Sequence, residues 1–285
     1  MRRVCIWMLA LAVTACMGAA HAALIPLPDS DTFSDGSLAT PVPGWTGSAT
    51  ESGGVAVITT ANYSWRYMQR NGHYTKDWTN DAVKKLTFSW DMDPDLISTD
   101  NHRDAAMGIE VLTPTAADPE FGDNDGVGYM ALLTKDGLLR LIRDPRRGKS
   151  TTGVTTLISQ NILGTFSSAK TTTLSYTLDV EVTDVPNTTA EWTLAVTDGN
   201  SVLSFNATDT VFLPLSGYDS YGTWLNITWD DFEVGVGRYA KVAVTPTFDN
   251  WSAEEPEPPQ PVAEPGSAAL VLLGAFGLTR KRRCV

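Results

Sequence analysis

Apolar and polar residues alternate along much of this chain, and this period of two constrains the fold more than any other feature. Residues two positions apart lie on the same face of a β-strand, so each alternating run predicts a strand with one buried face and one face in water. The apolar members of four such runs are Leu86, Phe88, Trp90 and Met92; Met107, Ile109 and Val111; Leu174, Tyr176, Leu178, Val180 and Val182; Trp192, Leu194 and Val196.

Turn signals separate these runs. Asp136-Gly137 and Asp198-Gly199 each stand between apolar segments, and Asp-Gly favours the positive φ of a tight antiparallel hairpin. Helical periodicity is confined to the two ends of the chain. The pattern therefore predicts an all-β fold, a two-sheet antiparallel sandwich over residues 23–253, with helices only in the N-terminal signal and in an apolar C-terminal segment.

The N-terminus has the layout of a secretory signal peptide over residues 1–22. Arg2 and Arg3 precede an apolar run, and Ala20-His21-Ala22 suits signal peptidase. We therefore expect export, with signal peptidase as a processing partner. An alternative is lipidation at Cys16, because Val13-Thr14-Ala15-Cys16 resembles a lipobox.

Cysteine usage and charge narrow the function of the exported part. All three cysteines lie in the end segments, so residues 23–262 contain none and gain nothing from disulfides. Without the two ends, the chain has 15 Lys and Arg against 32 Asp and Glu, a net charge of −17. Such a surface repels nucleic-acid phosphates and favours cations or uncharged partners. Calcium and polysaccharide both fit.

The C-terminal region has three parts. Residues 254–262 form a linker rich in Pro and Glu, which favours an extended chain. Residues 263–285 then contain Ala263-Glu264-Pro265-Gly266, an apolar stretch over residues 268–278 and four consecutive basic residues from Arg280. An eleven-residue helix would span only about 16 Å, against roughly 30 Å of hydrocarbon, so we expect only transient contact with the inner membrane.

This tail resembles the PEP-CTERM sorting signal of Gram-negative bacteria. That motif normally reads Val-Pro-Glu-Pro and stands here as Val262-Ala263-Glu264-Pro265, with alanine in place of the first proline. The resemblance implies processing by an exosortase, a location at the cell surface or in the extracellular matrix, and a setting of biofilm and exopolysaccharide production. A simple tail anchor is the alternative. The residues of the implied sorting signal are Glu264, Pro265, Arg280, Arg282 and Arg283.

The central region resembles a laminin-G or concanavalin A-like jelly roll. The similarity rests on Asp31-Thr32-Phe33, on Asp125-Gly126-Val127-Gly128-Tyr129 and on Phe248-Asp249-Asn250-Trp251. Many such domains bind sugars and hold a structural calcium ion, so the resemblance implies both without locating either.

Two groups of acidic residues are candidates for calcium. Asp118, Asp123 and Asp125 lie in an acidic loop that does not have the ligand order of an EF-hand. Asp31 and Asp249 form the second group, because the closing strand of a jelly roll commonly lies beside the opening one. The alternative for both groups is solvated turns without a metal.

One stretch combines aromatic and polar side chains in the way that sugar binding needs. Aromatic faces stack on pyranose rings while neighbouring polar groups bind the hydroxyls. Residues 217–224 offer a second, weaker candidate. The alternative for the first stretch is a buried strand face. Its candidate residues are Tyr63, Trp65, Arg66, Tyr67, Arg70, Tyr74 and Trp78.

Catalytic patterns are scarce. No glutamate has an aspartate two positions later, as a laminarinase-like hydrolase would need, and Asp230, Asp231 and Glu233 are more typical of a solvated strand. We therefore expect a non-enzymatic module that binds extracellular polysaccharide. The alternatives are a polysaccharide-acting hydrolase or lyase on the same fold and a purely structural biofilm-matrix protein.

Overall fold

The computed structural model describes residues 25–40, 44–47, 49–58, 66–70, 74–96, 103–112, 127–143, 155–212, 220–229 and 245–256. Every regular element in these ranges is a β-strand, which confirms the predicted all-β fold. In the same ranges, no helix has the length and apolar character needed to cross a membrane. The predicted helical signal and the apolar C-terminal helix lie outside the described residues.

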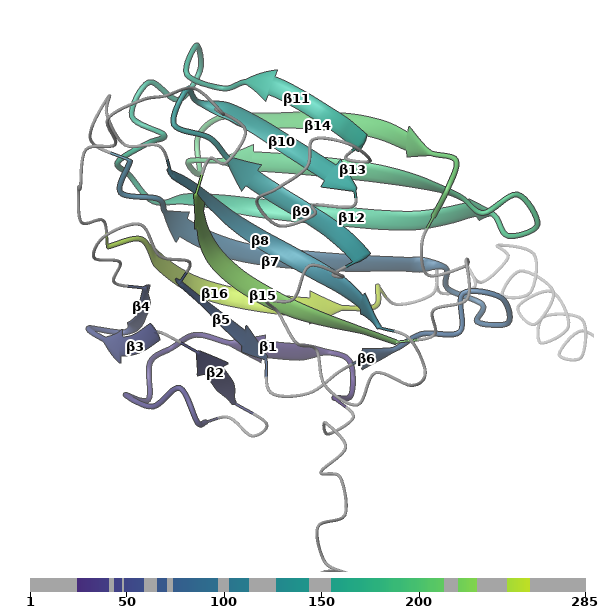
Figure 1. Ribbon diagram of the computed structural model, residues 1–285, viewed down its shortest axis with the longest axis horizontal. Coiled ribbons are helices and arrows are strands. Elements are labelled where there is room, and N and C mark those ends of the chain that lie inside the picture. Colours follow the sequence, from purple (N-terminus) through teal and green to yellow (C-terminus); the bar gives the residue numbers. More distant parts are fainter. Residues whose placement is uncertain are drawn as a thin grey trace, which may run out of the picture.

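The strands form two antiparallel sheets of eight strands each (Figure 1). The first, called the β7 sheet, has the order β14 (Val202–Asp209), β13 (Thr189–Thr197), β12 (Leu174–Asp184), β7 (Lys85–Asp93), β16 (Thr247–Glu254), β4 (Val55–Ile58) and β3 (Ala49–Ser52), and β1 (Asp29–Asp31) also pairs with β16. The second, called the β8 sheet, has the order β11 (Thr155–Asn161), β10 (Leu138–Arg143), β9 (Val127–Leu133), β8 (Arg103–Leu112), β15 (Ser220–Trp229), β5 (Arg66–Arg70) and β2 (Trp45–Gly47), and β6 (Tyr74–Thr75) also pairs with β15.

Alternating burial along the strands produces the core between the sheets. In β7 and β13 every second residue is buried, and the apolar residues that the sequence singles out occupy those positions. The register places Trp90 opposite Tyr176 on β12, where their rings stack with centroids 5.4 Å apart. The predicted sandwich is confirmed because both sheets contribute to one contiguous core.

The two predicted Asp-Gly hairpins are present. Gly137 connects β9 to β10 with φ of 76°, and Gly199 connects β13 to β14 with φ of 88°. A side chain at either position would strain the backbone, because L-residues rarely adopt this conformation. Turn chemistry therefore determines the register of both hairpins.

The opening and closing strands lie side by side, as the jelly-roll resemblance implies. β1 pairs with β16 in antiparallel register, with Asp31 opposite Trp251. β16 ends at Glu254, and the next residue, Glu255, forms an ion pair with the buried Lys76 at 2.8 Å. The start of the predicted Pro-rich linker is thus attached to the sandwich.

Candidate functional site

The outer face of the β7 sheet is polar. Thr87 Oγ1 donates a hydrogen bond to Asp179 Oδ1 at 2.6 Å, and Thr193 Oγ1 donates to Asn206 Oδ1 at 2.9 Å. These short side chains satisfy one another across neighbouring strands. The outward positions of β7 and β12 are partly or fully exposed, so this face is hydrophilic.

The outer face of the β8 sheet has a different composition. Met130 and Leu132 on β9 and Ile142 on β10 are 6%, 4% and 4% exposed, yet they are not among the residues of the core between the sheets. Their neighbours Ala131 and Leu141 belong to that core. β9 is therefore buried on both faces, and the outer face of the β8 sheet is apolar at its centre.

Strand pairing brings the two aromatic candidate stretches together. β5 contains Tyr67 from the first stretch, and the adjacent strand β15 contains Trp224 from the second. Paired residues share a face of the sheet, so two rows of residues cross the outer face. One row is Gln69, Trp224, Gly108, Met130 and Ile142, and the other is Tyr67, Asn226, Ala106, Leu132 and Arg140.

This outer face is the candidate binding site. Gly108 and Ala106 occupy the β8 positions of the two rows, between the aromatic strand pair and the apolar centre. Gly108 is itself buried, as are Met130 and Leu132 beside it, so the part of this face that is open to a ligand has to lie toward β5 and β15. The register places the aromatic residues Tyr67 and Trp224 and the amide residues Gln69 and Asn226 in these rows, and aromatic and amide residues together have the chemistry that a sugar chain needs.

Arg140 provides the site with a cation. Its Nε is buried, yet within the described part of the chain this donor has no hydrogen-bond partner. Buried donors are normally paired, so an unpaired one calls for an explanation. In its row, Arg140 lies opposite Leu132 on β9 and Ser159 on β11.

This apolar centre was not among the sequence-based predictions, although β9 carries a signal for it. Residues 130–133 read Met-Ala-Leu-Leu without alternation, and a continuous apolar run is typical of a strand that is buried on both faces. Arg140 and Gly108 have no comparable sequence signal, because only the register places them in the site.

Three predicted sugar-binding residues are core residues instead. Arg70 and Tyr74 are 1% and 0% exposed, and Trp78 is 5% exposed. The predicted stacking role of these three side chains is therefore corrected, because a ring or guanidinium that is covered by protein has no face to offer a sugar. The polar atoms of Arg70 and Tyr74 have internal partners.

Arg70 links the two sheets through a buried ion pair. Its Nε and Nη2 donate to the two carboxylate oxygens of Asp29 at 2.8 and 2.7 Å, and its Nη1 donates to Asp31 at 3.2 Å. Tyr74 also donates its hydroxyl to Asp29, at 2.7 Å. Two-pronged pairing of this kind compensates for much of the desolvation of both charges.

Asp31, predicted as a calcium ligand, thus belongs to a buried ion-pair cluster together with Asp29, Arg70 and Tyr74. Its carboxylate accepts hydrogen bonds from the backbone N–H of Phe33 at 2.8 Å and from Trp45 Nε1 at 2.9 Å. Burial raises the pKa of Asp31, and these two donors and the charge of Arg70 oppose the shift.

A second link of the same type joins the sheets at the other side. Arg143 on β10 forms an ion pair with Asp209 on β14, and Tyr129 on β9 donates its hydroxyl to Asp209 at 2.8 Å. Asp209 is 1% exposed. Each link therefore joins an arginine and a tyrosine of the β8 sheet to aspartate in the β7 sheet.

Asp249, the other predicted calcium ligand at the chain ends, lies near Asp31 as expected. It pairs with Asp91 across β16 and β7, and Asn250 Nδ2 donates to Asp91 at 2.7 Å. Burial, together with the charges of Asp91 and Asp31, raises the pKa of Asp249. Among the described residues, no three His, Cys, Asp or Glu side chains are grouped as metal ligands.

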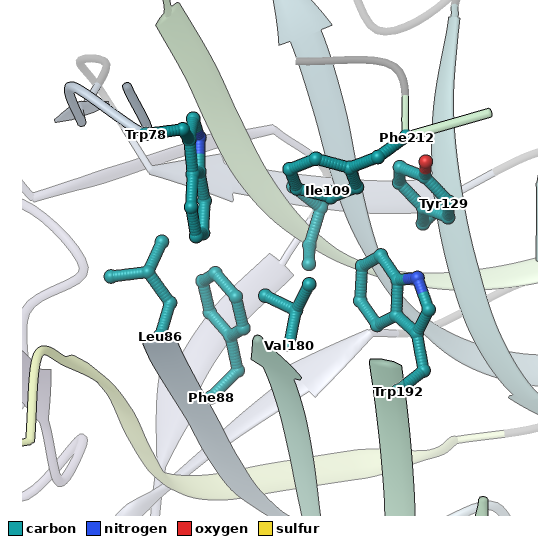
Figure 2. A pocket seen from close by; sticks show the side chains of 8 residues that line it. All are labelled: Trp78, Leu86, Phe88, Ile109, Tyr129, Val180, Trp192 and Phe212. Carbon is teal, nitrogen blue, oxygen red and sulfur yellow. The ribbon is translucent and has the colours of Figure 1, made fainter. Parts of the chain in front are cut away.

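A small cavity lies inside the core and is separate from the outer face (Figure 2). Its volume of about 10 Å³ suits at most one water molecule, and its lining is apolar or aromatic, so it is a packing defect and has no room for a sugar. The lining residues are Trp78, Leu86, Phe88, Ile109, Tyr129, Val180, Trp192 and Phe212.

Several predicted site residues cannot be placed. The backbone of Arg66 and Tyr67 belongs to β5, but their side chains are not described. The candidates outside the described residues are Tyr63, Trp65, Asp118, Asp123, Asp125, Asp230, Asp231, Glu233, Glu264, Pro265, Arg280, Arg282 and Arg283.

Comparison with known proteins identifies the architecture. No protein-family model matches the sequence, and no curated protein matches it significantly. Among solved structures, a PL-14 alginate lyase from Aplysia kurodai is similar with a TM-score of 0.50 and 14% identity, over 80% of this chain and 98% of the lyase. The carbohydrate recognition domain of Emp46p, in its potassium-bound form, is similar with a TM-score of 0.50 and 12% identity, over 80% of this chain and 97% of that domain.

The fold is a lectin-like jelly roll. At these identities the likeness applies to the fold alone, and function has to be argued from the site.

Proposed function

We propose that this protein is an exported, exosortase-processed module that binds extracellular polysaccharide through the outer face of the β8 sheet. The pairing of β5 with β15 carries the proposal, because it unites the two stretches that the sequence independently favours for sugar binding.

The similar solved structures support this class of ligand. One is named a lyase of alginate, a polysaccharide, and the other a carbohydrate recognition domain. This architecture therefore accommodates sugar chains in other proteins. The acidic outer surface of the β7 sheet favours use of the opposite sheet.

Glycan binding by matched variants tests the site. A glycan array first identifies a bound glycan, and titration calorimetry then measures its Kd. We expect Trp224→Ala and Tyr67→Ala each to raise this Kd about tenfold or more, because the loss of one stacking contact of about 1.4 kcal/mol changes Kd tenfold. Thr177→Ala on the outer face of the β7 sheet is the control and should bind normally. Equal binding by all three variants, or no glycan bound by the parent protein, would contradict the proposal.

Two additions to the same assay address calcium and catalysis. Binding with calcium and with a chelator shows whether the cation supports the site, and calcium remains a prediction. The alternative of a hydrolase or lyase predicts new chain ends when the bound polysaccharide is incubated with protein. Binding without depolymerisation is the expected result.

The sorting tail has a test of its own. The resemblance to PEP-CTERM predicts that a host exosortase removes the residues after the motif near Glu264 and Pro265. Mass spectrometry of the protein from cells with and without the exosortase gene should show a shorter C-terminus only when the enzyme is present. Alanine at Glu264 and Pro265 should retain the full tail. An intact tail in exosortase-positive cells argues for a simple anchor.

A further inference from the structure

We propose that residues 25–31, called the N-terminal latch, dock onto the sandwich only after signal peptidase has removed residues 1–22. The inference rests on the proposed export of the protein. The latch contains strand β1, and its first residue, Ile25, stands three positions after Ala22, the expected cleavage site. Docking and cleavage therefore involve the same short stretch of chain.

Burial of Ile25 makes docking and cleavage mutually exclusive. Ile25 is 3% exposed and belongs to the core, and Leu27 packs against the same core. Three extended residues span about 11 Å, which is less than the radius of gyration of about 13 Å for a folded domain of 100 residues. The active site of signal peptidase therefore cannot enclose the bond after Ala22 while Ile25 is buried in the sandwich.

The latch completes the core around a buried cation. Asp29 and Asp31 on β1 provide the carboxylates that pair with Arg70, at 2.7 and 3.2 Å. The guanidinium of Arg70 also lies 5.3 Å from the centroid of the Trp45 ring and 5.7 Å from that of Trp251. Without the latch, Arg70 would lose both carboxylate partners, and an unpaired charge in a core is strongly destabilising. The fold around Arg70 is therefore complete only when the latch is docked.

Strand order keeps the latch open long enough for cleavage. In the described structure, β1 pairs only with β16, the last strand of the chain. Synthesis and export begin at the N-terminus, so β16 crosses the membrane after every other described strand. Until then β1 has no strand to pair with. The cleavage site is thus accessible first and becomes unusable later.

Removal of the C-terminal tail does not face the same restriction. β1 and β16 are antiparallel, with Asp29 opposite Ala253, so the latch begins beside the end of β16. Just beyond that end, Glu255 pairs with the buried Lys76 at 2.8 Å. The nine residues from Glu255 to Glu264 can reach about 30 Å. The sorting motif can therefore be processed with the latch docked, whereas the signal peptide cannot.

Cleavage of the full-length precursor by purified signal peptidase in detergent tests this order. The precursor is diluted from urea into detergent buffer, and the peptidase is added either at once or after refolding. We expect cleavage to be about tenfold slower or more after refolding, because the enzyme then acts only on molecules whose latch has opened locally. Mass spectrometry should place the new N-terminus at Ala23.

Two matched variants separate opening of the latch from global unfolding. Asp29→Asn weakens the pairing with Arg70 and should restore rapid cleavage of the refolded precursor. Asp209→Asn weakens the equivalent buried link to Arg143 on the other side of the core, and this precursor should be cleaved as slowly as the parent. Near-UV circular dichroism checks that both refolded variants keep their tertiary packing.

The comparison of the parent before and after refolding needs no variant. Equal cleavage rates in the two states, or equal acceleration by the two variants, would overturn the latch and leave the proposed export unaffected. A precursor that is not cleaved even at once after dilution would overturn the latch together with the signal-peptidase route.

Discussion

At the scale of single residues, the role of each acidic group depends on what surrounds it. Asp29 and Asp31 are paired with Arg70, and Asp209 is paired with Arg143. Asp249 has no cation partner among the described residues and lies opposite Asp91. Like charges directly opposite each other on paired strands are destabilising. Sequence alone presents all of these residues as equivalent carboxylates.

Asp249→Asn should therefore stabilise the protein at neutral pH, by about 0.5 kcal/mol. Burial and the charges of Asp91 and Asp31 raise the pKa of Asp249. The Asp249 carboxyl therefore stays protonated to a higher pH in the folded state than in the unfolded state. The free energy of unfolding falls as the pH rises through the pKa of Asp249 in the folded state. Urea unfolding from pH 3 to pH 7 should show the gain at pH 7 and its disappearance below the unfolded pKa near 3.8.

Asp198→Asn is a control in which we expect the change in the free energy of unfolding to have the opposite sign. Asp198 accepts hydrogen bonds from the backbone N–H groups of Ser201 at 2.7 Å and Asn200 at 2.9 Å, which lower its pKa. The stabilisation of the fold by Asp198 is fully present above the pKa of this carboxyl in the unfolded state. It is lost as the pH falls through the pKa of Asp198 in the folded state. This variant should be destabilised at neutral pH and unaffected in strong acid. Parallel pH profiles for the two variants would contradict the argument.

At the scale of elements, hairpins and sheet edges are shaped by turn chemistry and by neighbouring packing. Both Asp-Gly turns could be predicted from sequence, because each short hairpin loop needs a residue with positive φ, which glycine adopts readily. The space around each glycine could not be predicted from sequence. A Cβ at Gly137 would lie 2.3 Å from Leu163 Cγ, whereas a Cβ at Gly199 would meet no heavy atom within 4 Å.

Gly137→Ala should consequently destabilise the protein more than Gly199→Ala. The backbone strain costs about 1–2 kcal/mol at either position, and the clash with Leu163 adds about 1–3 kcal/mol at Gly137. Thermal or urea unfolding measures both variants. In a Leu163→Ala background, the cost of Gly137→Ala should fall to that of Gly199→Ala. An unchanged difference would show that Leu163 is not the cause.

At the scale of the whole molecule, the two sheets divide the chemistry between them. The outer face of the β7 sheet carries hydroxyls and carboxylates, whereas the β8 sheet has a buried apolar centre on its outer side, next to the strand pair β5 and β15. The two Arg–Asp–Tyr links hold these layers together on opposite sides of the core. The net charge of the chain says nothing about which of these two faces would bind a ligand, because charge is a property of the whole surface.

Sequence by itself determined the strands β7, β8, β12 and β13, the two hairpins and the sandwich class, because alternation and turn chemistry are local properties of the chain. It also nominated both aromatic stretches for sugar binding. Only the tertiary structure decided that Arg70 and Tyr74 belong to a buried ion-pair cluster while Tyr67 shares a face with Trp224. Residues far apart in sequence become neighbours through strand pairing, and burial depends on which layer covers each face; neither is encoded locally.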